Sequence, residues 1–91
     1  MRTFKIEFEG SLTLELASAV IEAVDDEWRS RFYTLHTPAE IAEHIAHNLF
    51  FNRWELSSLD GWTDQPDENA MIIDEDFYIT SCEETEEANH A

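Results

Sequence analysis

The sequence predicts a small α+β domain in which two helices pack on one face of a mostly antiparallel sheet, in the chain order β-β-α-α-β. Three patterns lead to this prediction. Apolar and polar side chains alternate over residues 3–17, apolar side chains recur with a helical period over residues 18–54, and alternation returns over residues 71–81. With 91 residues, of which 43% are hydrophobic, the chain can form one modest core.

The N-terminal segment is expected to form two strands joined around Gly10 and Ser11. A strict two-residue loop would divide the apolar side chains of this segment between the two faces, whereas a three-residue or bulged loop places all of them on one face. We therefore expect a bulged hairpin that pairs Phe8 with Leu12. The six apolar positions are Phe4, Ile6, Phe8, Leu12, Leu14 and Leu16.

A first amphipathic helix is expected over about residues 18–32. Val20, Val24 and Trp28 fall in one apolar stripe, and charged and polar residues occupy the opposite side. This stripe predicts that the helix packs against the sheet.

The second helix has a clearer beginning. Thr37 is a typical N-cap, Pro38 suits the first helical position, and Glu40 completes a capping box. The helix is expected to continue to about Arg53 or Trp54.

The remaining chain is expected to cross back to the sheet and form a strand. Gly61, Pro66 and several Asp and Asn residues predict an irregular crossing. Residues 71–81 then predict one strand, or two short strands broken at residues 74–76. The folded domain is expected to span residues 1–82, and the polar composition of residues 83–91 predicts an acidic, disordered tail.

The net charge of −16 is the most informative feature of the composition. A compact domain of this length would have a diameter of roughly 30 Å, which gives about one net charge per 1.9 Å, close to the one per ~1.7 Å of duplex DNA. After Arg53 the chain has twelve acidic residues and neither lysine nor arginine. Such a surface should repel nucleic acids and anionic membranes and attract basic grooves.

The expected cellular compartment and the expected lack of enzymatic activity follow mainly from motifs that the sequence does not contain. Cys82 is the single cysteine, and no segment reads as a signal peptide or a membrane span. We therefore expect a cytoplasmic protein, in the host cytoplasm if the source is a phage. With only Gly10 and Gly61, the chain has no glycine-rich phosphate loop. We expect no enzymatic activity and no cofactor.

A metal site is not expected either. His44 and His47 each lie four residues after a glutamate, whereas di-iron helices use Glu-x-x-His, and zinc normally needs three or four ligands. The aspartate-rich crossing does not fit the EF-hand template from any starting residue. These residues are more typical of a helix surface.

A second stripe on the same helix lies opposite its core stripe and includes His44, His47 and Phe51, with Trp54 close by. Two explanations remain open. The crossing around Trp62 buries this side within the monomer, or the stripe is an oligomer interface, such as that of a homodimer, because aromatic residues are enriched at interfaces.

The acidity has three explanations: adaptation to high salt, a solubilising surface, or imitation of a phosphate backbone. In size, composition and charge the whole chain resembles the small acidic inhibitor proteins of phages and mobile elements, of the anti-CRISPR and anti-restriction kind, several of which are DNA mimics. Those proteins have unrelated folds and share no motif, so the resemblance implies no site residue.

The preferred hypothesis is a non-enzymatic DNA or RNA mimic that binds the basic nucleic-acid-binding groove of a partner and does not bind nucleic acid itself. Its contact residues would be alternate acids on the open sheet face and a second cluster on the first helix. These are Glu7, Glu15, Asp74 and Asp76, and Asp25, Asp26 and Glu27. The alternative is a small binding or dimerisation module with a generally acidic surface.

Overall fold

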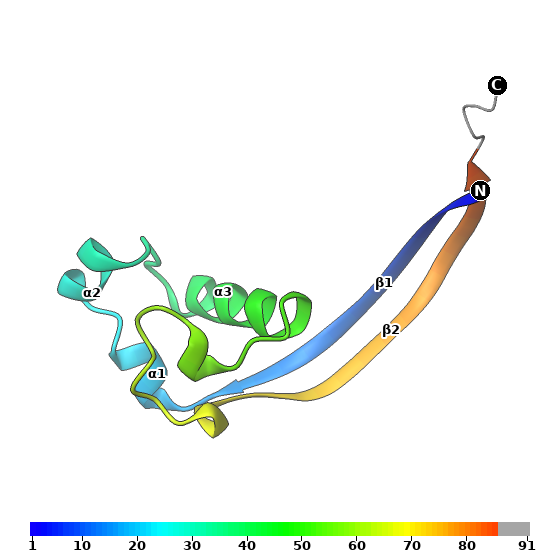
Figure 1. Ribbon diagram of the computed structural model, residues 1–91. Helices are drawn as coiled ribbons and strands as arrows, with labels where there is room; N and C mark the ends of the chain where they lie inside the picture. Colours follow the sequence, from blue (N-terminus) through cyan, green and yellow to red (C-terminus); the bar gives the residue numbers. More distant parts are fainter. Residues whose placement is uncertain (86–91) are drawn as a thin grey trace.

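Two long antiparallel strands at the ends of the described chain flank a helical module (Figure 1). The computed structural model describes residues 1–85. The elements are β1 (Thr3–Leu16), α1 (Ser18–Glu22), α2 (Asp26–Arg31), α3 (Pro38–Phe51), the 3-10 helices η1 (Leu56–Ser58) and η2 (Asp67–Asn69), and β2 (Ala70–Thr85). The mixed α+β character is present, but the order is β-α-α-α-β, and the described sheet has two strands.

The expected hairpin at Gly10 is wrong, because Gly10 lies in the middle of the continuous strand β1. The apolar residues before and after Gly10 all have even numbers, so one uninterrupted strand already places them on one face. Gly10 permits a close approach instead of a turn. A Cβ at this position would clash with Cδ1 of Phe77 on the opposite strand.

The register of the ribbon contains two β-bulges, both of which add a residue to β2. Glu7 pairs with Ser81 and Phe8 with Ile79, so Thr80 is the extra residue of the first bulge. Ile73 is the extra residue of the second. The strand β2 therefore stays continuous through residues 74–76, where a break had been considered.

The first predicted helix is divided into α1 and α2. The first segment ends at Glu22. Asp25 begins the second as its N-cap, because its side chain accepts a hydrogen bond from the backbone N–H of Trp28 at 2.8 Å. The predicted start of α3 is confirmed, with Thr37 and Glu40 forming the capping box. This helix ends at Phe51, two residues before the expected range.

The core lies inside the helical module. Trp62 is fully buried, and its indole N–H donates to the backbone oxygen of Val20 at 3.0 Å. The ring of Trp28 lies 4.8 Å from that of Trp62, and its own N–H donates to the oxygen of Gly61 at 3.0 Å. The other buried core residues are Val24, Ile41, Ile45, Leu56, Leu59 and Ala70.

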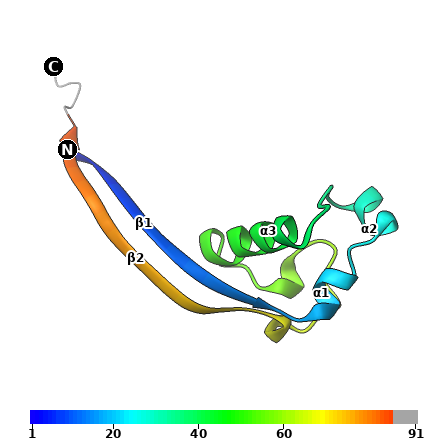
Figure 2. The same ribbon diagram turned by 180° about the vertical axis from the view of Figure 1, so that it is seen from behind.

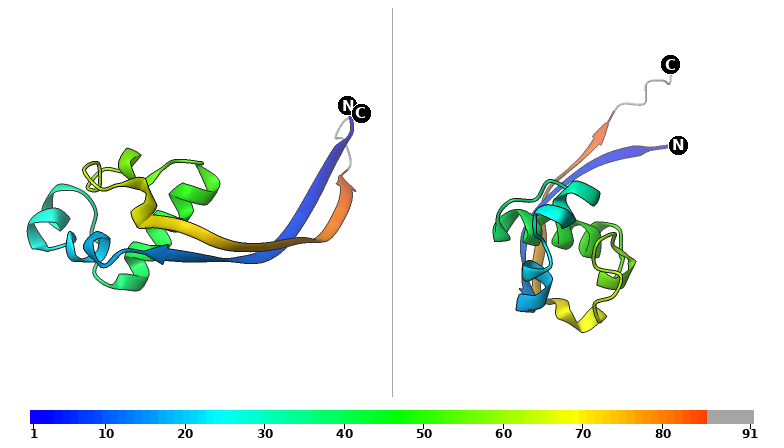
Figure 3. Two further views of the ribbon diagram at one scale, coloured as in Figure 1. Left: turned by 90° about the horizontal axis from the view of Figure 1, so that it is seen from below. Right: turned by 90° about the vertical axis from the view of Figure 1, so that its left-hand side faces the viewer.

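The molecule is elongated because the core contacts only one end of the ribbon (Figures 1 and 2). Its extents are 55 × 28 × 21 Å, and its radius of gyration is 17.9 Å, against about 12 Å for a compact domain. The views in Figure 3 show that the outer part of the ribbon extends beyond the helices. The helices thus cover one end of a two-stranded ribbon, and a sandwich over a broad sheet is not what the described residues form.

Two consequences concern the charge. A length of 55 Å, in place of roughly 30 Å for a compact domain, nearly halves the linear charge density at the same net charge. The segment from residue 83 onward had been expected to be a tail, but β2 continues to Thr85 and includes Glu83 and Glu84. The rest of the expected tail, residues 86–91, lies outside the described residues.

Candidate functional site: the two faces of the ribbon

The ribbon has one acidic face. Directly paired residues of antiparallel strands project to the same side, and successive residues alternate. Together with the two bulges, this rule places six acids and one lysine on the side of the ribbon opposite α3. We call this surface the acidic face; its charged residues are Lys5, Glu7, Glu9, Glu15, Asp74, Asp76 and Glu83.

The carboxylates of the acidic face form a single file. Glu9 lies opposite Tyr78, Asp76 opposite Ser11, and Asp74 opposite Thr13, and the other acids of this face likewise have no acidic partner directly across the ribbon. Like charges directly opposite each other are destabilising, so the staggered arrangement avoids that cost. Successive levels are two residues apart, which corresponds to about 6.6 Å along the ribbon.

Lys5 is the single base on the acidic face. Its Nζ lies 3.4 Å from Oε2 of Glu7, and its paired residue across the ribbon is Glu83. The side chains of Lys5 and Glu7 are both more than half exposed, and exposed ion pairs of this kind contribute little. Lys5 offsets part of the negative charge near the tip, and the rest of the acidic face carries acids and no described base.

The acids predicted from the strands share this face, whereas those predicted from the helix do not. Glu7, Glu15, Asp74 and Asp76 are all exposed on the acidic face. Glu9 and Glu83 were missed, because Glu9 was assigned to a turn and Glu83 to the tail. The odd number of Glu9, which matches those of Glu7 and Lys5 on the same strand, is the feature that could have identified it, whereas the place of Glu83 depends on the bulges.

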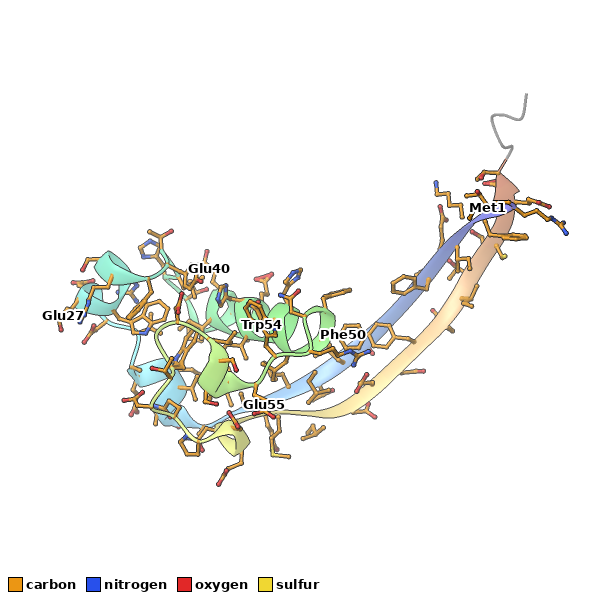
Figure 4. All side chains as sticks on the ribbon, viewed as in Figure 1. Met1, Glu27, Glu40, Phe50, Trp54 and Glu55 are labelled. Carbon is orange, nitrogen blue, oxygen red and sulfur yellow. The ribbon has the colours of Figure 1, made fainter. Side chains whose placement is uncertain are left out.

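The acidic cluster on α2 lies at the end of the molecule remote from the tip of the ribbon, as the positions of Glu27 and Met1 show (Figure 4). Two of its members already have local partners. Asp25 caps α2, and Asp26 accepts a hydrogen bond from Nη1 of Arg29 at 3.0 Å. This cluster is therefore separate from the acidic face.

The opposite side of the ribbon is mainly apolar, with Glu75 and Glu84 as its acids, and faces α3 at its inner end. Phe77 connects the two parts, because its ring stacks on that of Phe50 with 4.7 Å between centroids and lies edge-on to that of Phe8 at 6.5 Å. Beyond Phe77 the side chains are exposed. We call this outer part the apolar face; its residues are Phe4, Ile6, Phe8, Ile79 and Cys82.

The predicted second stripe on α3 is partly buried within the monomer and partly exposed. His44 contacts Tyr33 and Trp62, with ring centroids 4.4 and 6.0 Å away. Burial lowers the pKa of His44, and the nearby His47 lowers it further. His47 and Phe51 are exposed and contact each other at 5.1 Å between ring centroids.

Glu55 and Asp67 form a carboxyl pair with opposed shifts. The hydrogen bond and negative charge of Asp67 raise the pKa of Glu55, while hydrogen bonds from Ser57 lower the pKa of Asp67. The N–H of Ser57 donates to Oδ1 of Asp67 at 2.9 Å, which ties η1 to the start of η2. The pair lies on an exposed turn and has this structural role.

Within residues 1–85, no group of three or more His, Cys, Asp or Glu side chains is arranged to hold a metal ion. None of the described helices combines the length and the apolar character needed to cross a membrane. Comparisons of the chain with protein-family models, with curated proteins and with solved structures gave no significant match.

Proposed function

We propose that the protein is a non-enzymatic inhibitor whose acidic face occupies the basic nucleic-acid-binding groove of a partner protein, in the manner of phage anti-CRISPR and anti-restriction proteins. The observation that supports this proposal best is the single file of carboxylates on the acidic face. Because these residues belong to paired strands, the backbone fixes their spacing and direction, as a mimic requires.

The spacing favours a groove that binds a single strand. The acidic face presents about one carboxylate per 6.6 Å, whereas each strand of a duplex carries one phosphate per ~3.4 Å of axis and the duplex one per ~1.7 Å. A single file on a narrow ribbon imitates one backbone better than two. Single-strand binding proteins hold their ligand in a positively charged groove that follows one backbone.

The aromatic side chain within the file is consistent with such a groove. Tyr78 lies on the acidic face opposite Glu9 and is 58% exposed. Single-strand grooves contain aromatic rings on which bases stack. Tyr78 would occupy the position of a base between two carboxylates that take the positions of phosphates.

The proposal is tested by affinity capture from a bacterial lysate with the wild-type protein and two double variants. Asp74→Lys with Asp76→Lys reverses two charges on the acidic face. The control, Asp60→Lys with Asp64→Lys, makes the same change in net charge at two exposed loop positions away from the ribbon. Captured proteins are identified and tested for displacement by a single-stranded oligonucleotide and by a duplex.

The acidic-face variant is expected to bind the captured partner tenfold to a hundredfold more weakly, on the order expected for charge pairs in an interface, and the control is expected to bind nearly as wild type does. Affinity should also fall with rising salt, because the exchange is electrostatic. Equal weakening by both variants would point to net charge alone. Binding that is unaffected by the acidic-face variant or by salt would refute the proposal.

A further inference from the structure

The apolar face is unusual for an isolated ribbon. Phe4, Ile6, Phe8 and Ile79 are 48%, 50%, 56% and 66% exposed, and they form one continuous strip. A two-stranded ribbon is at best marginally stable in water unless a further strand or a helix covers its apolar side. Within the described chain α3 covers only the inner end of this side.

The apolar face is also electrically neutral. Its one acid near the tip is Glu84, which lies opposite Phe4 and accepts two hydrogen bonds from the guanidinium of Arg2, each of 2.8 Å. The guanidinium carbon of Arg2 lies 5.8 Å from the ring centroid of Phe4. The acids of the neighbouring strand positions all point to the opposite side of the ribbon.

We propose that the apolar face binds the same face of a second copy of this chain, so that the two ribbons pack against each other about a two-fold axis. The charge distribution permits this occupant on the apolar face, and the exposed apolar area favours it. Two copies with a net charge of −16 each repel one another, and the neutral strip is a side from which they can approach. In the packed pair the acidic faces point outward, on opposite sides of two sheets about 10 Å apart.

The exposed apolar area covers most of what a dimer of standard size needs. Taking about 200 Å² for an aromatic side chain, Phe4 and Phe8 expose on the order of 200 Å², and the two isoleucines add roughly 150 Å². A standard interface uses about 800 Å² per partner, and about 65% of a homodimer interface is apolar, hence roughly 500 Å².

The proposed dimer does not depend on the proposed function. Rising salt should affect the stability of the dimer and the binding of a basic groove in opposite directions. Salt screens the repulsion between two acidic copies, and the screening length at ~0.1 M salt is about 10 Å. The dimer should therefore be at least as stable at ~0.5 M salt as at ~0.1 M. Binding to a basic groove should weaken over the same range. Either proposal can therefore fail while the other holds.

The test is sedimentation velocity with light scattering over a concentration series, on the wild type and a matched pair of variants. Ile79→Glu places a carboxylate on the apolar face, and Tyr78→Glu places one on the acidic face at the adjacent residue of the same strand. The two side chains are 66% and 58% exposed in the monomer. Tryptophan fluorescence, which reports the core around Trp28 and Trp62, verifies that both variants are folded.

The wild type is expected to be a dimer at micromolar concentration, and Tyr78→Glu is expected to leave the dimer intact. Ile79→Glu should raise the dissociation constant at least a hundredfold, because the substitution occurs in both subunits. Cys82 gives a second measurement: it lies opposite Ile6 on the apolar face and is exposed in the monomer. Its reaction with a maleimide should be slow in the wild type and fast in Ile79→Glu.

Three outcomes would overturn the proposal. The first is a wild type that stays monomeric up to about 100 μM with a fully reactive Cys82, which would leave the apolar face to a different partner. The second is equal dissociation by both variants. The third is a polydisperse wild type, since undirected association of apolar surface gives no defined dimer.

Discussion

Phe77 is the side chain that holds the ribbon to the helical module. Its ring stacks on Phe50 of α3 with an interplanar angle of 19° and covers Gly10 on the opposite strand. The three residues come from β2, α3 and β1, so one ring connects the three longest elements. Replacing Phe77 by alanine should therefore loosen the ribbon from the module as well as lower stability.

The magnitude follows from burial. With about 200 Å² for an aromatic side chain and 37% of Phe77 exposed, roughly 125 Å² is removed from water, which at ~25 cal/mol per Å² corresponds to about 3 kcal/mol. A compact unfolded state lowers this figure. We expect Phe77→Ala to reduce the free energy of unfolding by about 2 to 3 kcal/mol, within the usual range for such truncations.

The assay is urea denaturation followed by tryptophan fluorescence, in a double-mutant cycle with Phe50→Ala. A stacked aromatic pair contributes about 0.5 to 1.5 kcal/mol beyond area, so the two substitutions should be non-additive by about 1 kcal/mol. Tyr78→Ala, at the next residue on the opposite face, is the control and should cost less than about 1 kcal/mol. A loss below about 1 kcal/mol for Phe77→Ala, or additivity within ~0.5 kcal/mol, would refute the role given to the ring.

The other predictions concern the strand glycine and the capping box. Gly10→Ala should destabilise the fold by about 1 to 3 kcal/mol, because its Cβ would clash with Cδ1 of Phe77. Urea denaturation should show a smaller loss in a Phe77→Ala background, and a gain in stability would contradict this geometry. Thr37→Val removes the hydroxyl that accepts the N–H of Glu40 at 3.1 Å and should cost about 1 kcal/mol in the same assay. Hydrogen bonds from the N–H groups of His36 and Thr37 lower the pKa of Glu40 below its ordinary value of 4.5. The stabilisation is therefore present above that value and is lost as pH falls through the lower pKa; Glu40→Gln should reduce the difference in stability between pH 7 and pH 3, and an unchanged difference would count against the cap.

Local chemistry allowed one element to be predicted with its boundaries. Thr37, Pro38 and Glu40 define the start of α3 through interactions within four residues, and the structure has this start. The break between α1 and α2 has a local cause too, namely the Asp25 cap. It was missed because the apolar stripe runs through it without a change of period.

The sheet could not be predicted in the same way, because its pairing is non-local. Thr3 pairs with Thr85, on the far side of the whole helical module. Gly10 and Ser11 satisfied a local rule for turns, and no short-range feature showed that Phe77 would cover the glycine. The alternation within β1 was recognised, and the error was to insert a turn into a pattern that needed none.

The candidate site could be predicted only as far as the alternation of side chains along each strand could be read from the sequence. Glu7, Glu15, Asp74 and Asp76 were assigned to one face from alternation alone, and the register places them there. The position of these acids relative to Glu83 depends on the bulges. A bulge cannot be read from one strand, because it is defined by the residues opposite it.

The bulges are therefore the structural cause of the separation between the acidic and apolar faces. In β1 the residues on the side of α3 and the apolar face have even numbers throughout. In β2 the residues on that side are even-numbered at Ala70, odd-numbered at Phe77 and Ile79, and even-numbered again at Cys82. A one-residue shift of register moves every later side chain to the other face. If Thr80 paired with Glu7 and no bulge formed, Glu83 would lie opposite Phe4 on the apolar face and lose its place across from Lys5. The neutral strip proposed as a dimer interface and the carboxylate file proposed as a nucleic-acid mimic thus both depend on the register that the two bulges set.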